Sequence, residues 1–199
     1  MVPETPRIPL NELISLAADL QRIFEEQQWS FCFIGGLAVQ SWSEPRYTKD
    51  VDLTLLTGFG SEETFIDLLL THFAPRRPDA RAFALVNRVL LLRSKAGIGV
   101  DIAMGALPFE EAAVRRARAV EVYPGITLRL CTPEDLIVMK VFAGREQDWR
   151  DVRFTIVRQG VDQLDWRYIR KHLTPLAALK EAPEIMDQLE ALRKKYAGT

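Results

Sequence analysis

Histidine and cysteine are scarce in this sequence, with two of each in 199 residues. The histidines, His72 and His172, are too few and too far apart for a Ser-His-Asp arrangement or a zinc site. The cysteines, Cys32 and Cys131, each lie in an apolar run far from the other, which favours buried reduced thiols over a disulfide. This scarcity excludes triad hydrolases and zinc enzymes and is typical of a cytoplasmic protein.

The chain also lacks an excess of charge and a long apolar run. Its 26 Lys and Arg residues nearly balance 27 Asp and Glu residues, so any anionic substrate must be met by local positive charge. No run of about 18 apolar residues occurs, as a membrane-spanning helix would need. The amino-terminal segment MVPETPRIPL has no charged stretch followed by an apolar one. We therefore expect a cytoplasmic protein with no membrane partner.

The composition, with 48% hydrophobic and 27% charged residues, is that of an ordinary globular protein. Apolar periodicity predicts strands and helices in mixed order up to about residue 145, and helices alone after residue 149. The predicted strands are residues 31–34, 50–56, 83–93, 98–104 and 126–131; the predicted helices include residues 11–28, 61–73, 109–119, 132–142, 150–158, 162–172 and 183–196. The sequence thus predicts an α/β (α+β) fold, with a mixed sheet flanked by helices in residues 1–145 and a carboxy-terminal helical tail in residues 146–199, packed on or beside it.

A glycine pair and an aspartate pair stand out in the first half of the chain. Gly35 and Gly36 follow a predicted strand, and such a turn leaves backbone N–H groups uncovered for a phosphate at the start of the next helix. Asp50 and Asp52 alternate with apolar residues, so both carboxylates share the wet face of a strand. An Asp-x-Asp pair taken alone is also compatible with an ordinary solvent face.

Asp101 adds a third carboxylate within an otherwise apolar predicted strand. A buried aspartate at this position requires a partner or a metal ion. Pairing of residues 83–93 with residues 98–104 through a short turn would place Asp101 in the sheet that holds Asp50 and Asp52. Three clustered carboxylates repel one another, so they indicate divalent cations bound through oxygen, with two Mg²⁺ ions expected and Mn²⁺ as an alternative.

Together these features resemble the nucleotidyltransferase (DNA polymerase β-like) superfamily, which has a glycine turn, an acidic pair and a third acid on a later strand. The resemblance covers roughly residues 31–158. The Arg-x-Thr-x-Asp-x-Asp motif is more similar to minimal enzymes of bacterial toxin–antitoxin and abortive-infection systems than to polymerases. It rests on Arg46, Thr48, Asp50 and Asp52. The resemblance implies a nucleotidyltransferase-like sheet and a metal-dependent transfer of a nucleoside monophosphate from an NTP, such as ATP, to a hydroxyl acceptor.

By the same resemblance, Lys140 would contact the triphosphate, although a lysine on an apolar helix can also extend to water without a ligand. Arg46, Thr48 and Lys49 are candidate nucleotide or acceptor contacts, or ordinary loop residues. Three charged residues after Lys140 could belong to the site or form a surface ion-pair cluster. Its members are Asp148, Arg150 and Asp151.

The sequence does not identify the acceptor. RNA or protein would fit a toxin-type enzyme with a cognate antitoxin protein as partner. A small molecule would fit an aminoglycoside-type adenylyltransferase. A third alternative is a nucleotide-binding module that keeps the fold without turnover.

Overall fold

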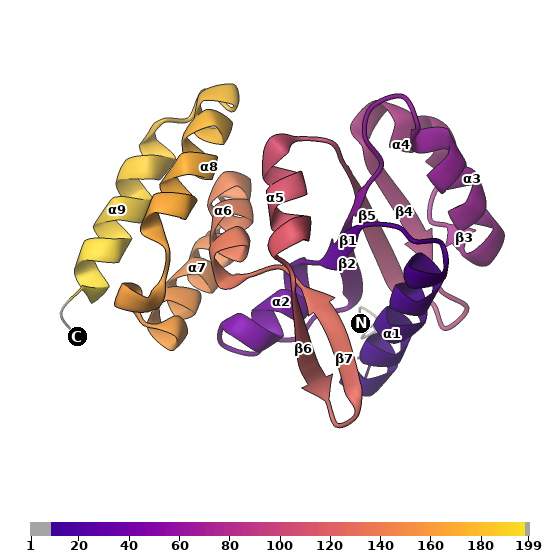
Figure 1. Cartoon of the computed structure of the whole chain (residues 1–199), viewed down its shortest axis with the longest axis horizontal. Coiled ribbons are helices and arrows are strands. Elements are labelled where there is room, and N and C mark those ends of the chain that lie inside the picture. Colours follow the sequence, from indigo (N-terminus) through magenta and orange to yellow (C-terminus); the bar gives the residue numbers. More distant parts are fainter. Residues whose placement is uncertain (1–8, 198–199) are drawn as a thin grey trace, which may run out of the picture. The chain divides into compact units, whose positions relative to one another are not determined.

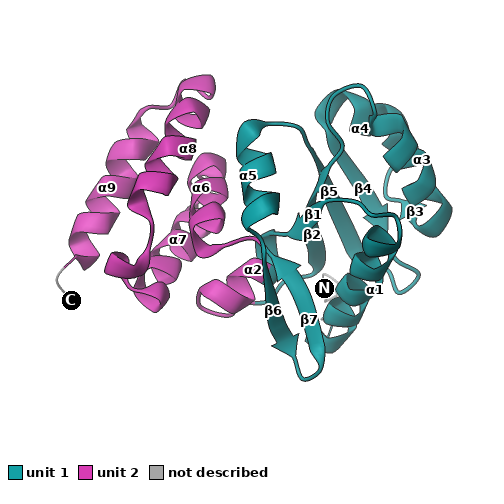
Figure 2. Cartoon of the chain, in the orientation of Figure 1, with its two compact units in different colours: residues 1–37, 47–130 teal, residues 38–46, 131–199 magenta. Residues whose placement is uncertain are grey.

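A computed structural model describes residues 9–197 and divides them into two compact units (Figure 2). Unit 1 holds the described residues up to Leu37 together with Tyr47–Leu130, and unit 2 holds Ala38–Arg46 and the described residues from Cys131 onward. The sequence predicts a boundary near residue 145, whereas the contacts group the chain from Cys131 onward with the helical part. The amino-terminal segment on which the expectation about targeting rests lies mostly outside the described residues.

Unit 1 is built on a mixed sheet, as the sequence predicts. Within residues 9–197 the sheet has seven strands in the order β3-β4-β5-β2-β1-β7-β6 (Figure 1). Strand β2 is parallel to β5 and β1 is parallel to β7, while the other neighbours are antiparallel. The strands are β1 (Phe31–Phe33), β2 (Asp50–Leu56), β3 (Ala74–Pro75), β4 (Val89–Arg93), β5 (Gly99–Gly105), β6 (Arg118–Tyr123) and β7 (Ile126–Leu130).

Helix α1 (Leu10–Glu26) packs on β7 and β2 of this sheet. Its buried residues follow the predicted helical spacing, and Phe24 meets Phe31 of β1 edge to face at a ring distance of 5.1 Å. Helix α5 contacts β2 and β1, and helix α3 packs against α4. These helices are α3 (Glu62–His72), α4 (Ala80–Asn87) and α5 (Pro108–Arg116). The apolar faces of the helices and of the sheet thus form the core of unit 1.

Unit 2 is helical. Thr132 caps helix α6 (Pro133–Ala143): its hydroxyl accepts from the Asp135 N–H, and the Asp135 carboxylate accepts from the Thr132 N–H. The other elements are α7 (Glu146–Gln159), η1 (Val161–Gln163), α8 (Trp166–Leu179) and α9 (Glu184–Tyr196), together with most of α2 (Gly35–Trp42), which begins in unit 1. No helix among residues 9–197 is both long enough and apolar enough to cross a membrane.

Three local predictions are wrong. Residues 83–93 are not one strand, because α4 extends to Asn87 and β4 begins only after Arg88, which has a left-handed backbone (φ 54°). Strand β6 follows α5 where the sequence predicts helix to residue 119. The helix predicted over residues 162–172, with a break at Pro175, instead continues through that proline as α8. Short apolar runs do not distinguish helix from strand, and a helix tolerates one missing N–H where packing supports it.

Candidate active site

The three predicted aspartates lie on one face of the sheet in unit 1. Parallel strands β2 and β5 pair Asp52 with Asp101 and Asp50 with Gly99. Residues two apart on a strand, and residues paired across neighbouring strands, point to the same side. The intervening apolar residues of both strands are fully buried on the opposite face: Val51, Leu53, Val100 and Ile102. The alternation therefore directs all three carboxylates away from that core.

The glycine pair lies beside Asp52 at the start of α2. Gly35 has a left-handed backbone (φ +54°), and a Cβ there would overlap the Asp52 carboxylate. The Gly36 N–H donates to Asp52 Oδ2 at 3.3 Å, and a Cβ on Gly36 would overlap Thr48. The positive end of the helix dipole thus faces the Asp52 carboxylate. In this structure the Gly36 N–H, predicted to face phosphate, is engaged by an aspartate.

Thr48 and Lys49 immediately precede the aspartate strand. The Thr48 hydroxyl donates to the Asp50 carbonyl oxygen at 3.3 Å, which ties the loop to the beginning of β2. The Lys49 side chain is exposed, and its charge lowers the pKa of Asp101. Both residues therefore lie in unit 1 near the aspartates.

Arg76 lies among the aspartates although no sequence pattern places it there. Its guanidinium forms an ion pair with Asp101 and lies 3.8 Å from Asp50, measured from Nη1 to Oδ1. Arg76 follows the two-residue strand β3, and its N–H donates to the Leu91 carbonyl oxygen at 3.0 Å. A strand this short has no recognisable periodicity, so only the sheet pairing reveals that Arg76 faces the aspartates.

Asp101 has a pKa well above the ordinary value of an aspartate. Burial raises its pKa, and repulsion by Asp52 and Asp50 adds to this, while Arg76 and Lys49 act in the opposite direction; the pKa reaches about 6. The raised pKa of Asp101 is therefore mainly an effect of burial, which the neighbouring positive charges do not fully offset. Within residues 9–197, no group of three or more His, Cys, Asp or Glu side chains is arranged to hold a metal ion as it stands.

The other two predicted contacts, Arg46 and Lys140, meet inside unit 2. Arg46 donates two hydrogen bonds of 2.9 Å to Asp151, from Nε to Oδ1 and from Nη2 to Oδ2. Lys140 Nζ lies 2.8 Å from Asp151 Oδ2 and 2.9 Å from Asp148 Oδ1. Arg145 completes the network through a bond of 2.6 Å from its Nε to Asp148 Oδ2. Both cations thus neutralise carboxylates within the protein.

This network is not the surface cluster that the sequence allows as an alternative. The Asp148 and Asp151 side chains are only 1% and 3% exposed. Burial alone would raise both pKa values, but hydrogen bonds and charges from Arg145, Arg46 and Lys140 outweigh it, and both pKa values are lowered. The Arg145 side chain lies at the surface, and so does Arg150, which pairs with Glu44 at 3.4 Å.

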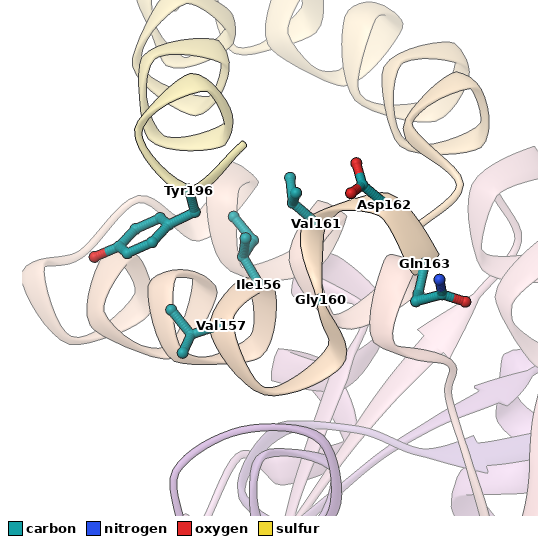
Figure 3. Close-up of a pocket in the computed structure, with 7 residues that line it drawn as sticks. All are labelled: Ile156, Val157, Gly160, Val161, Asp162, Gln163 and Tyr196. Atoms are coloured by element: carbon teal, nitrogen blue, oxygen red, sulfur yellow. The ribbon is translucent and has the colours of Figure 1, made fainter. Parts of the chain in front are cut away.

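A separate hollow of about 580 Å³ opens in unit 2 around the turn from α7 into η1 (Figure 3). Its lining consists of Ile156, Val157, Gly160, Val161, Asp162, Gln163 and Tyr196. None of the site residues predicted from the sequence lines this hollow. It therefore provides no argument about the aspartate site.

Comparison with solved structures identifies the fold. The chain is similar to an antigenic nucleotidyltransferase-like protein from Paracoccidioides brasiliensis, with a TM-score of 0.53 and 17% identity over 91% of this chain and 93% of that chain. It is also similar to the antibiotic-resistance factor ANT(2'')-Ia, with a TM-score of 0.58 and 14% identity over 89% of this chain and 98% of that chain. Likeness at this level of identity establishes a nucleotidyltransferase-like fold alone.

Comparison with protein families is more specific. No curated protein sequence matches the chain. Residues 11–196 match the family described as "Nucleotidyltransferase of unknown function (DUF6036)", and this match includes all the site residues predicted from the sequence. The chain is therefore a nucleotidyltransferase and belongs to that family.

Proposed function

We propose that this enzyme transfers a nucleoside monophosphate from an NTP to a hydroxyl acceptor at a site formed by Asp50, Asp52 and Asp101. The observation that carries the proposal is the in-register pairing of Asp52 with Asp101, which gathers three carboxylates on one sheet face beside the start of α2. Membership of a nucleotidyltransferase family supplies the reaction class. The acidic face supplies the residues through which that class of reaction is catalysed.

The donor set suits divalent cations. Carboxylate oxygens are the ligands that Mg²⁺ and Mn²⁺ prefer, and the pairing of β2 with β5 places three carboxylates on one face of the sheet. We propose that Asp50, Asp52 and Asp101 hold two such ions. When bound, these ions would neutralise the phosphates and lower the pKa of the attacking hydroxyl. The hydrogen bond from Gly36 would keep the Asp52 carboxylate oriented toward the site.

We assign the nucleotide side of the site to Gly35, Gly36, Thr48 and Lys49. The two glycines let the Asp52 and Thr48 side chains approach a helix amino terminus, where anions are favoured, and the exposed Lys49 brings positive charge close to Asp101. Arg46 and Lys140 have a different role in the proposal. Because both are already paired with Asp151, we assign them to the stability of unit 2.

For the acceptor, we propose RNA or protein, as in a toxin-type enzyme with a cognate antitoxin as partner. This choice of acceptor rests on the Arg-x-Thr-x-Asp-x-Asp motif that ends in Asp50 and Asp52. A small-molecule acceptor is the second candidate. It is favoured by the similarity in fold to an antibiotic-resistance factor, which extends over 98% of that chain.

The deciding experiment measures pyrophosphate release from each of the four NTPs with Mg²⁺, with total cellular RNA, a protein extract or an aminoglycoside as acceptor. Each reaction is paired with a no-acceptor control and with Asp52→Asn. We expect release that requires an acceptor and Asp52, with label from the NTP recovered on that acceptor. Full activity of Asp52→Asn would overturn the assignment of the site. Binding of NTP without release under every condition would instead favour a nucleotide-binding module.

A further inference from the structure

A row of four residues crosses the sheet of unit 1 and ends at the carboxylate face. Arg76 is bonded through its N–H to the Leu91 carbonyl oxygen, Leu91 pairs with Asp101, and Asp101 pairs with Asp52. Residues paired in this way across neighbouring strands lie on the same side of a sheet. The Arg76 side chain therefore extends past Leu91 toward the three aspartates.

The guanidinium of Arg76 lies among the carboxylates. It forms an ion pair with Asp101 and approaches Asp50, and these three side chains are between 23% and 32% exposed. Gly99, directly opposite Asp50, makes this arrangement possible. A Cβ on Gly99 would overlap Asp50 Oδ1 and would lie 3.0 Å from Arg76 Nη1. The missing side chain thus opens the space in which the carboxylate and the guanidinium meet.

This position of Arg76 leaves one of its donors unsatisfied. Arg76 Nε is buried and has no hydrogen-bond partner within residues 9–197. A buried donor without a partner costs free energy, so the guanidinium is held by its two ion pairs against this cost. A stronger cation at the carboxylates could therefore displace the Arg76 side chain, because Arg76 Nε would then be free to donate a hydrogen bond elsewhere.

We infer that Arg76 is an internal counter-cation that occupies the cation position of the metal-free enzyme and withdraws when a divalent ion binds. This inference rests on the proposed function of Asp50, Asp52 and Asp101. Arginine keeps its charge at any physiological pH, so it cannot yield by losing a proton and must move. A guanidinium and a divalent ion that compete for the same carboxylate oxygens also repel each other. Arg76 therefore lowers the affinity of the site for metal.

The test is a titration of metal-free protein with Mn²⁺ in the absence of nucleotide, in which unbound Mn²⁺ is measured by electron paramagnetic resonance. We expect Arg76→Ala to bind Mn²⁺ roughly tenfold more tightly than the wild type, since a competing charge has been removed from a half-buried site. Lys49→Ala is the matched control, because it removes one positive charge near Asp101 without vacating a position among the carboxylates. Its effect should be clearly smaller.

Equal affinity in Arg76→Ala and the wild type, or equal gains in Arg76→Ala and Lys49→Ala, would overturn the inference. Thermal unfolding in EDTA and in Mn²⁺ provides a second readout, in which Arg76→Ala should be less stable without metal and gain more from it. Arg76→Gln, which keeps a polar side chain of similar shape, replaces the alanine variant if that variant does not fold.

The same titration separates the inference from the proposed function on which it rests. If the wild type binds Mn²⁺ and Asp52→Asn does not, the metal site stands, and an unchanged Arg76→Ala overturns the inference alone. If neither the wild type nor Arg76→Ala binds Mn²⁺, both the metal site and the inference fail. Binding by Arg76→Ala where the wild type shows none would support the inference most directly.

Discussion

Asp52 and Asp101 lie directly opposite each other on two parallel strands, and the Asp52 carboxylate also accepts the Gly36 N–H at the start of helix α2. One aspartate is thereby tied to a helix amino terminus, and the other is joined to Arg76. The two carboxylates have different electrostatic surroundings although they are neighbours in the sheet. These surroundings, together with the buried network of unit 2, determine how each residue responds to substitution.

Asp101→Asn should abolish catalysis without weakening the fold. We expect kcat for pyrophosphate release to fall roughly 100-fold or more, since a charge that positions the cations is lost. Stability should not fall at pH 7. A raised pKa means that the contribution of Asp101 to stability is present at low pH and lost as pH rises through about 6, so the ionised form is the costly one. Asp79→Asn, at an exposed carboxylate paired with Arg77, is the control and should keep full activity.

Gly99→Ala should weaken metal binding, because the alanine Cβ would displace the Asp50 carboxylate. The added methyl would overlap the Asp50 carboxylate, so we expect a loss of about 1 to 3 kcal/mol in the free energy of unfolding. Metal affinity should fall as well. Gly125→Ala, on the turn between β6 and β7, has open space around it and strain only from its positive φ, worth about 1 to 2 kcal/mol. The two variants should therefore lose similar amounts of stability in denaturant but differ in Mn²⁺ titration, and similar metal affinities would contradict this account.

Lys140→Met should destabilise unit 2. It leaves Asp148 and Asp151 buried with one positive partner fewer, which we expect to cost about 3 kcal/mol in denaturant unfolding. Adding Asp151→Asn to this variant should cost less than Asp151→Asn costs in the wild type, because the two side chains interact directly. A variant with unchanged stability and weakened NTP binding would instead support the triphosphate contact that the family resemblance implies.

The same network should make stability depend on pH. The pKa values of Asp148 and Asp151 are lowered in the folded protein, so both carboxylates bind fewer protons there than in the unfolded chain. Their contribution is present above the unfolded value of 3.8 and lost as pH falls through the folded values. Unfolding of Asp151→Asn at pH 7, 5, 4 and 3 should show a deficit that shrinks toward the lowest pH. A constant deficit would mean that the charge of Asp151 is not what stabilises the network.

The sequence by itself determined the elements whose cause is local. Alternation around Asp50 and Asp52 predicts the acidic strand face, the turn Gly35-Gly36 predicts the start of a helix, and Thr132 predicts the cap of α6. The structure has all three features. Each depends on residues close together in the chain, whose periodicity or hydrogen bonding is set by backbone geometry. The same glycine turn and aspartates carry the resemblance to nucleotidyltransferases, and the family match agrees with it.

Only the tertiary structure decided which distant residues meet. Arg76 reaches Asp101 because a two-residue strand pairs with β4, and Gly99 matters because it lies opposite Asp50. Asp151 joins Arg46 to Lys140 across a long stretch of chain. Such contacts depend on strand order, register and helix packing, which the free energy of the whole core selects and which no short segment encodes.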